Sequence, residues 1–249
     1  MTYCVGLRLK DGLVMLADTR TNAGVDNIAT FKKSHLFEDE GERFICAMTS
    51  GNLAITQAVI NLLTDGFESL MTGEVESLYS VDSMFRAAEL AGEAIRKVYQ
   101  RDGDALEQQD MRFSCALLLG GQIKGRGMRL FQIYSAGNFI EATEDTPFLQ
   151  IGEHKYGKPI LDRACKYDTA LNDGVKLALV SMDSTLRSNL TVGMPLDLVV
   201  YEKDHEKPSS NRRIEEDDPY FLMIRDTWST ALRDAYRAIP SADWLGAKP

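Results

Sequence analysis

The sequence predicts an α+β fold of stacked layers, a pattern that two face-to-face β-sheets with helices outside them would satisfy. Segments with the apolar pattern of strands come in blocks, and pairs of segments with helical periodicity separate these blocks. Grouped blocks of this kind favour stacked layers over a strictly alternating βαβ fold. The chain of 249 residues is also long enough to bury a core without disulfides or metals.

The first block of predicted strands opens with a hairpin. Residues 4–9 alternate, Asp11-Gly12 marks a tight turn, and residues 13–17 are nearly all apolar. A polar stretch over residues 19–30 predicts a loop. Two further strands of this block are expected over residues 34–38 and 43–49.

Two helices are predicted after this block. The first opens at Ser50-Gly51-Asn52 and runs to about residue 65, and the second starts near residue 82. The same periodicity arguments place the later elements. These are strands over 113–119, 128–135 and 148–151, helices over 156–166 and 170–188, and a last core strand over 196–201.

The composition changes after Lys203, and we therefore divide the chain into a domain over 1–203 and an extension over 204–249. Residues 205–218 are polar and charged, which predicts a linker. A final helix is expected over residues 219–239. Its apolar stripe fits either packing on its own core or a contact between subunits, and consists of Phe221, Ile224, Trp228, Leu232 and Ala235.

Charge and composition exclude several classes of protein. The formal net charge of -9 argues against a nucleic-acid partner, which calls for a basic face. No apolar run reaches the roughly 18 residues of a membrane span, and no signal-peptide pattern opens the chain. The four cysteines are predicted to be buried thiols in a reducing compartment, and the three histidines lack metal-ligand spacing. We expect a cytoplasmic protein without a metal or organic cofactor.

Short motifs carry the strongest functional signal. They include TYCVG at residues 2–6, KDG at 10–12, ADTR at 17–20, and Ser50-Gly51. Together they resemble the proteasome β-subunit family of N-terminal nucleophile hydrolases, over about four fifths of the chain. The runs at 17–26, 50–54 and 181–189 are most similar to its bacterial branch, Anbu (ancestral β-subunit). The resemblance implies a four-layer αββα sandwich with a C-terminal helical extension.

Thr2 is the nucleophile that the resemblance implies. Alone it means little, because many chains begin Met-Thr. Removal of Met1, without autolytic cleavage of a propeptide, is expected to give Thr2 a free amine. Such an amine has a reference pKa of about 7.7–8.0 and accepts the hydroxyl proton near neutral pH. One residue then holds both nucleophile and base.

Two charged residues are expected to tune this nucleophile. The resemblance places Asp18 beside Lys33, whose ammonium favours the deprotonated hydroxyl. Lys32 is the adjacent alternative, and the Lys-x-His-Leu-Phe frame favours Lys33. In many proteasome β-subunits a serine supports the nucleophile where this chain has Glu153. A carboxylate there is expected to act as an alternative proton acceptor or to change substrate preference.

The other expected site residues stabilise the transition state or bind the substrate. The N–H of Gly51, at a helix start, is a natural oxyanion donor. Asp183 is expected to hold the Thr2 amine or a water, with Ser188 as its helper. The resemblance also implies a substrate pocket with a mixed apolar and hydroxylic wall, lined by Thr21, Thr49 and Leu53.

The sequence therefore predicts a self-assembling threonine peptidase that cleaves peptide or amide bonds. The C-terminal helix and Glu153 motivate one alternative, an assembly protein with a weak or vestigial site. A small-molecule amidase is the other, because N-terminal nucleophile folds also support that chemistry. We expect a homo-oligomer of about a dozen subunits or more, in a ring or an open helical stack. Any energy-driven unfolding requires a separate ATP-dependent partner, since the chain has no P-loop.

Overall fold

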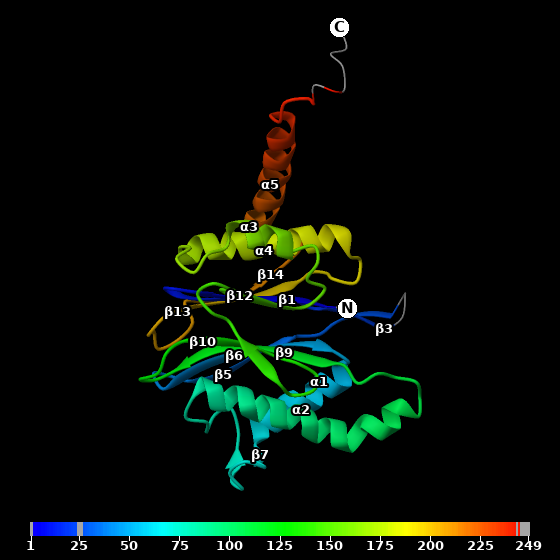
Figure 1. Cartoon of the computed structure of the whole chain (residues 1–249), viewed down its shortest axis with the longest axis vertical. Helices are drawn as coiled ribbons and strands as arrows, with labels where there is room; N and C mark the ends of the chain where they lie inside the picture. Colours follow the sequence, from blue (N-terminus) through cyan, green and yellow to red (C-terminus); the bar gives the residue numbers. More distant parts are fainter. Residues whose placement is uncertain (1, 24–26, 243, 245–249) are drawn as a thin grey trace.

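The protein is organised in four stacked layers (Figure 1). This computed structural model describes residues 2–23, 27–242 and 244. Two five-stranded antiparallel sheets lie face to face, one helical layer covers the outer face of each sheet, and the last helix points away from the body. The α+β sandwich expected from the sequence is confirmed.

The two sheets are built from consecutive and distant segments alike. The first has the order β12 (Phe148–Gly152), β1 (Tyr3–Leu9), β2 (Gly12–Asp18), β13 (Leu196–Glu202) and β14 (Ser210–Ile214). The second has the order β11 (Phe139–Glu141), β10 (Arg129–Ile133), β9 (Cys115–Ile123), β6 (Arg43–Gly51) and β5 (Ser34–Asp39). Two small hairpins complete the strands, β3 (Arg20–Ala23) with β4 (Asn27–Thr30), and β7 (Phe67–Glu68) with β8 (Val75–Glu76).

The helices cover the outer faces of the sheets. The second sheet is covered by α1 (Leu53–Asp65) and α2 (Met84–Glu107), and the first by α3 (Lys158–Ala164) and α4 (Leu171–Ser188). Asn52 caps α1 through its side-chain oxygen, as expected for a helix start. No helix in the part of the chain that the structure describes is long and apolar enough to cross a membrane.

Alternation along β1 explains how the layers hold together. Tyr3, Val5 and Leu7 belong to the apolar core beneath α3 and α4, whereas Cys4 belongs to the core between the two sheets. A third core joins the second sheet to α1 and α2. Both faces of each sheet are therefore covered, which accounts for the nearly continuous apolar runs in the central strands.

Two segments differ from the sequence-based expectation. The expected loop over 19–30 contains the hairpin β3–β4, and the expected linker over 205–218 contains β14, which pairs with β13. Both are polar segments, and in β14 only Ile214 is buried, so no apolar alternation marked it as a strand. The first sheet thus continues past residue 203.

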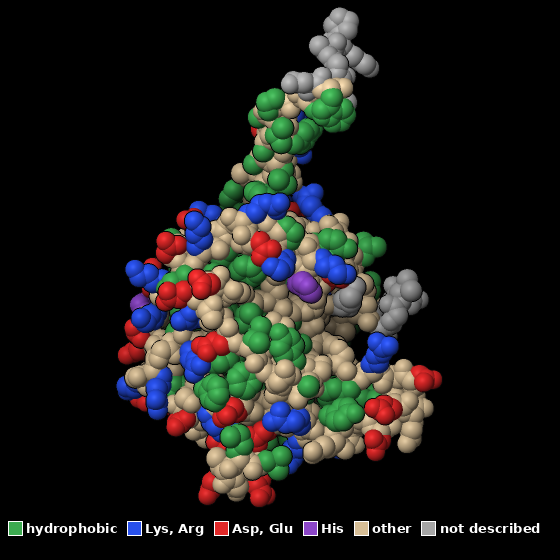
Figure 2. Space-filling model, in the orientation of Figure 1, with side chains coloured by type: hydrophobic (Ala, Val, Ile, Leu, Met, Phe, Trp, Pro, Cys, Tyr) green, Lys and Arg blue, Asp and Glu red, His purple; other side chains and the backbone are tan. Residues whose placement is uncertain are grey.

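The final helix, α5 (Pro219–Arg237), packs on its own core through only part of its apolar stripe. Phe221 and Ile224 are buried in the core against α4. The rest of α5 extends away from the body, and its surface carries a run of apolar side chains (Figure 2). Leu232 and Tyr236 are 49% and 60% exposed.

Candidate active site

An ion pair between Lys33 and Asp18 forms the buried centre of the site. Asp18 is the last residue of β2, and Lys33 lies immediately before β5. The Nζ of Lys33 is 2.7 Å from Oδ1 of Asp18, and it also donates to the carbonyl of Arg20 at 2.6 Å. Lys33 is 5% exposed, whereas the neighbouring Lys32 is exposed. The structure therefore brings Lys33, rather than Lys32, to Asp18.

The surroundings of Asp18 act on its charge in opposite directions. Burial raises the pKa of the Asp18 carboxyl above its ordinary value, and the Lys33 ammonium offsets part of that rise. The amides of Tyr3 and Gly193 donate to the two carboxylate oxygens at 3.0 and 3.2 Å and lower this pKa further. The ion pair and these donors favour the carboxylate, so Asp18 can serve as the counter-ion that holds Lys33 in place.

A narrow cleft opens beside this ion pair. Thr2, Lys33 and Gly51 line it together with the three residues expected to bind substrate, Thr21, Thr49 and Leu53. Three further lining residues were not predicted from the sequence, namely Asn22, Ser50 and Thr56. The wall is hydroxyl-rich with one apolar side chain, and Thr2 itself is 7% exposed. Met1, whose removal the sequence leads us to expect, lies outside the described residues.

Gly51 occupies a position that only glycine fits. Its φ is 126°, and a Cβ there would lie 2.2 Å from the carbonyl oxygen of Ser114. The amide of Thr49 donates to the carbonyl of Lys33 at 3.0 Å. Amides two residues apart on a strand point the same way, and β5 begins only at Ser34. The Gly51 amide therefore points past the end of β5, on the side where Lys33 lies.

Glu153 lies next to Thr2, immediately after β12, the strand that pairs with β1. Its amide donates to the carbonyl of Thr2 at 2.7 Å, which extends the β1–β12 pairing by one residue. Gly152 precedes it with a φ of 80° and lies so close to Thr2 that a Cβ would overlap the Thr2 carbonyl. The Glu153 side chain is buried and accepts from Nδ2 of Asn189 at 3.2 Å. At the position where many proteasome β-subunits have a supporting serine, this chain therefore has a buried glutamate.

Asp183 and Ser188 are not gathered at Thr2. Asp183 is buried on α4, where its two oxygens accept from Arg187 at 2.9 Å and from Arg225 of α5 at 2.8 Å. No hydrogen bond joins it to Thr2 within the described residues, and Ser188 is exposed at the end of α4. The side chain of Asp183 is committed to anchoring α5, which the helical periodicity of α4 alone did not reveal.

The loop between α4 and β13 supplies contacts that the sequence did not reveal. Its Gly193 amide reaches Asp18, its Asn189 reaches Glu153, and its Leu190 carbonyl accepts from Arg20 at 3.0 Å. These are mostly main-chain groups, and main-chain contacts leave little trace in a sequence. The glycine at 193 was the one available signal, since it marks a place where another group approaches the backbone closely.

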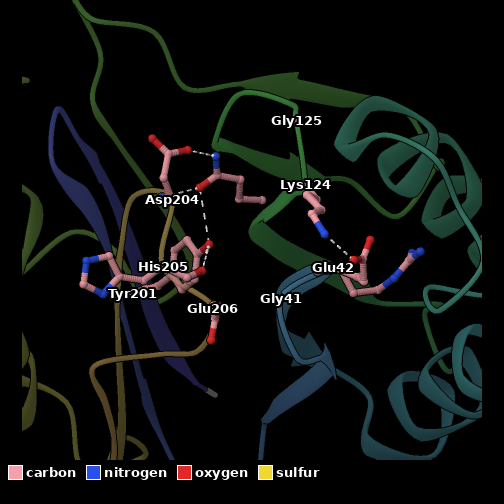
Figure 3. Close-up of a pocket in the computed structure, with 10 residues that line it drawn as sticks. Gly41, Glu42, Lys124, Gly125, Tyr201, Asp204, His205 and Glu206 are labelled. Carbon is pink, nitrogen blue, oxygen red and sulfur yellow. Dashed lines mark hydrogen bonds and ion pairs between the residues drawn. The ribbon is translucent and has the colours of Figure 1, made fainter.

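A second cleft is lined by residues from the segments 41–43, 122–125 and 201–206, at the ends of β5, β9 and β13 (Figure 3). Its polar groups bind one another, since Lys124 pairs with Glu42, and Gln122 bonds both Asp204 and Tyr201. Within the described residues, no group of three or more His, Cys, Asp or Glu side chains is placed to hold a metal ion.

Comparisons with known proteins identify the family and the fold. A family model for the proteasome subunit matches residues 2–200. Anbu from Yersinia bercovieri is 51% identical, with a TM-score of 0.88 and coverage of 96% of this chain and 98% of that one. The helical assembly of the Anbu complex from Pseudomonas aeruginosa is built from a chain that is 49% identical, with a TM-score of 0.88 and the same coverage.

More distant relatives extend the same likeness. The proteasome subunit beta of Methanococcus aeolicus is 24% identical over 86% of this chain and 90% of its own length. The fold is accordingly that of the N-terminal nucleophile hydrolases, as the sequence motifs implied. By the match over residues 2–200 and the full-length likeness at about half identity, this chain belongs to the proteasome subunit family, on its Anbu branch.

Proposed function

We propose that this protein is a threonine peptidase whose nucleophile is Thr2. The observation that supports this most is the gathering of Thr2, Lys33 and Gly51 on one cleft, with the Lys33–Asp18 ion pair buried beneath it. These groups supply a nucleophile, a fixed positive charge and an oxyanion donor, which are the parts that acyl transfer needs.

The proposed reaction has two stages. After Met1 is removed, the Thr2 amine takes the hydroxyl proton and Oγ attacks the carbonyl of a peptide or amide bond. The Gly51 amide stabilises the oxyanion, and the amine delivers its proton to the departing nitrogen as the C–N bond breaks. Water then attacks the Thr2 ester, releases the acid and restores the hydroxyl. Lys33, held by Asp18, stabilises the developing negative charge on Oγ.

The substrate in this proposal is an extended peptide whose side chain enters the cleft beside Thr21, Thr49 and Leu53. Glu153 pairs with Thr2 through its main-chain amide, and its carboxylate is proposed as an alternative proton acceptor or a determinant of substrate preference. The proposed reaction assigns no step to Asp183, which is bound by two arginines, or to Ser188, which is exposed.

We also propose that the protein forms a large homo-oligomer through α5. An exposed apolar helix face on an isolated subunit is a liability, and covering it with a second copy removes that liability. The Anbu complex of Pseudomonas aeruginosa forms a helical assembly. Head-to-tail contacts whose rotation does not close produce such helices, so we favour an open helical arrangement here.

The protein is proposed to act in the cytoplasm. All four cysteines are buried and free of disulfides, as in a reducing compartment. Any unfolding of protein substrates would come from a separate ATP-dependent partner.

Hydrolysis of a mixed peptide library by purified protein, with and without Thr2→Ala, tests the proposed peptidase. Intact mass spectrometry of the same sample first establishes that Met1 is absent. We expect cleavage by the wild type and none above a mock purification by the variant. Equal cleavage by both would refute the assignment.

A further inference from the structure

Arg20 contacts the active-site ion pair although it does not line the Thr2 cleft. It is the first residue of β3, and its carbonyl accepts from Lys33 Nζ at 2.6 Å. Its guanidinium Nη1 donates to the carbonyl of Leu190, in the loop between α4 and β13, at 3.0 Å. A single residue thus binds the catalytic lysine with its main chain and a distant loop with its side chain.

The same loop returns to the ion pair through Gly193. The Gly193 amide donates to Oδ2 of Asp18 at 3.2 Å. The Arg20 guanidinium lies against this glycine, because a Cβ on Gly193 would be 2.1 Å from Arg20 Nε and 2.3 Å from Cζ. Gly193 has no left-handed φ, so its backbone does not favour glycine, and the Arg20 guanidinium fills the space that a side chain at 193 would occupy.

These contacts form a closed circuit around the buried charges. Asp18 binds Lys33, Lys33 binds the Arg20 carbonyl, the Arg20 side chain binds the loop, and the loop amide binds Asp18. A second bond, from Thr19 Oγ1 to the carbonyl of Pro195 at 2.7 Å, joins the same two segments. The buried ion pair and the loop are therefore joined by contacts on both sides.

We propose that Arg20 is a positioning residue. Its side chain clamps the loop over residues 190–193, and the clamp holds Asp18 and Lys33 in the geometry that acylation of Thr2 requires. The predicted effect on acylation rests on the proposed peptidase function, whereas the clamping of the loop by Arg20 does not. Arginine suits the place because its flat guanidinium covers the glycine and still donates sideways to a carbonyl. A lysine ammonium can still donate to the carbonyl but cannot cover the glycine, so it preserves only part of this arrangement.

Kinetics of acylation by a threonine-directed probe test the catalytic part. For Arg20→Ala we expect the maximal acylation rate to fall about 10- to 100-fold, because small displacements of catalytic groups have effects of this size. The half-saturating probe concentration should stay unchanged, since Arg20 does not line the cleft. Arg20→Lys should recover part of the rate.

Arg96 provides a matched control on the far side of the sandwich. Its Nη1 donates to the carbonyl of Gly137 at 3.1 Å and lies against that glycine in the same way. Arg96→Ala should keep the wild-type acylation rate at a temperature where both variants are folded. An equal loss in Arg96→Ala, or no recovery in Arg20→Lys, would reduce Arg20 to a general stabilising residue and overturn the proposal.

Lysine labelling tests the clamp without using activity. An amine-reactive ester, with the products located by mass spectrometry, compares buried Lys33 with its exposed neighbour Lys32 in the same molecule. Labelling of Lys33 relative to Lys32 should rise in Arg20→Ala and not in Arg96→Ala. If Lys33 stays as protected as in the wild type, the clamp is refuted. If Lys33 is freed while the wild type itself is never acylated, the clamp stands and the proposed peptidase function fails.

Discussion

The Nζ of Lys33 lies 2.7 Å from Oδ1 of Asp18, and water barely reaches either side chain. Removing two charges from water is costly, and a buried ion pair often adds no net stability over apolar residues of similar volume. Thr2 and Gly51 share the adjacent cleft with Lys33. The pair is therefore better explained by chemistry at that cleft than by stabilisation of the fold.

Lys33→Ala is predicted to reduce acylation of Thr2 at least about a hundredfold, because it removes the fixed positive charge beside the nucleophile. It should also lower the free energy of unfolding by about 3 kcal/mol, since Asp18 loses its counter-ion. Asp18→Asn should lower activity no more than Lys33→Ala, because the carboxylate acts through the lysine. Rate measurements and chemical denaturation on the same preparations check both effects.

The double variant and a neighbouring lysine serve as controls for this unit. Asp18→Asn combined with Lys33→Ala should be little worse than Lys33→Ala alone, because members of a catalytic unit are not additive. Lys32→Ala should behave as wild type, since Lys32 is exposed. Full activity in Lys33→Ala would remove the lysine from the mechanism.

Gly51→Ala is predicted to lose activity and about 2–3 kcal/mol of stability. Its φ of 126° is unfavourable for any residue with a Cβ, and that Cβ would collide with the Ser114 carbonyl. Gly41→Ala is the matched control, because Gly41 has a φ of 75° and nothing within 4 Å of its Cβ position. It should lose only about 1 kcal/mol and no activity. Equal unfolding midpoints in urea for the two variants would contradict this account.

Stability should fall as the pH rises above 9 because the thiols are buried. Burial raises the pKa of Cys46 and of Cys115 from 9.0 to about 12, so the folded protein retains protons that the unfolded chain releases. Each thiol then lowers the free energy of unfolding by about 1.4 kcal/mol per pH unit between 9 and 12. In Cys46→Ala, denaturant curves at pH 8 and pH 10.5 should differ less than in wild type. Equal differences would show that Cys46 does not contribute.

Removing residues 229–249 is predicted to shrink the particle while the body stays folded. This truncation keeps Phe221 and Ile224, which are buried, and removes the exposed part of α5. Light scattering at micromolar concentration measures the size, and thermal unfolding should change little. A truncation after Asp204 should instead destabilise the whole domain, because it removes β14 and both buried side chains. A wild-type protein that runs as a monomer would refute assembly through α5.

The sequence was sufficient to predict the stacked layers and many of the residues that line the Thr2 cleft. Strand and helix periodicities report burial directly, and the central strands and the long helices are deeply buried, so their positions followed from the pattern. The prediction that Asp18 lies beside Lys33 came from motif resemblance and agrees with the 2.7 Å contact. The polar strands β3 and β14 were missed because they carry no apolar alternation.

The remaining site features depend on three-dimensional contacts that no local pattern records. The Gly193 amide reaches Asp18 across 175 positions of sequence, and it does so through a main-chain group present in nearly every residue. Asp183 shows the opposite problem. The family resemblance led us to expect a catalytic role for this carboxylate. In the structure its two oxygens accept from Arg187 and from Arg225 of α5, a helix far along the chain.

The central claim is that Thr2 is the nucleophile, and mapping a covalent adduct tests it most directly. Wild-type protein without Met1 is treated with a threonine-directed acylating probe, digested, and sequenced by tandem mass spectrometry. We predict one probe molecule per chain, attached at Thr2, and no adduct in Thr2→Ala under the same conditions. An adduct on another residue, or no adduct on folded protein that has lost Met1, would contradict the claim.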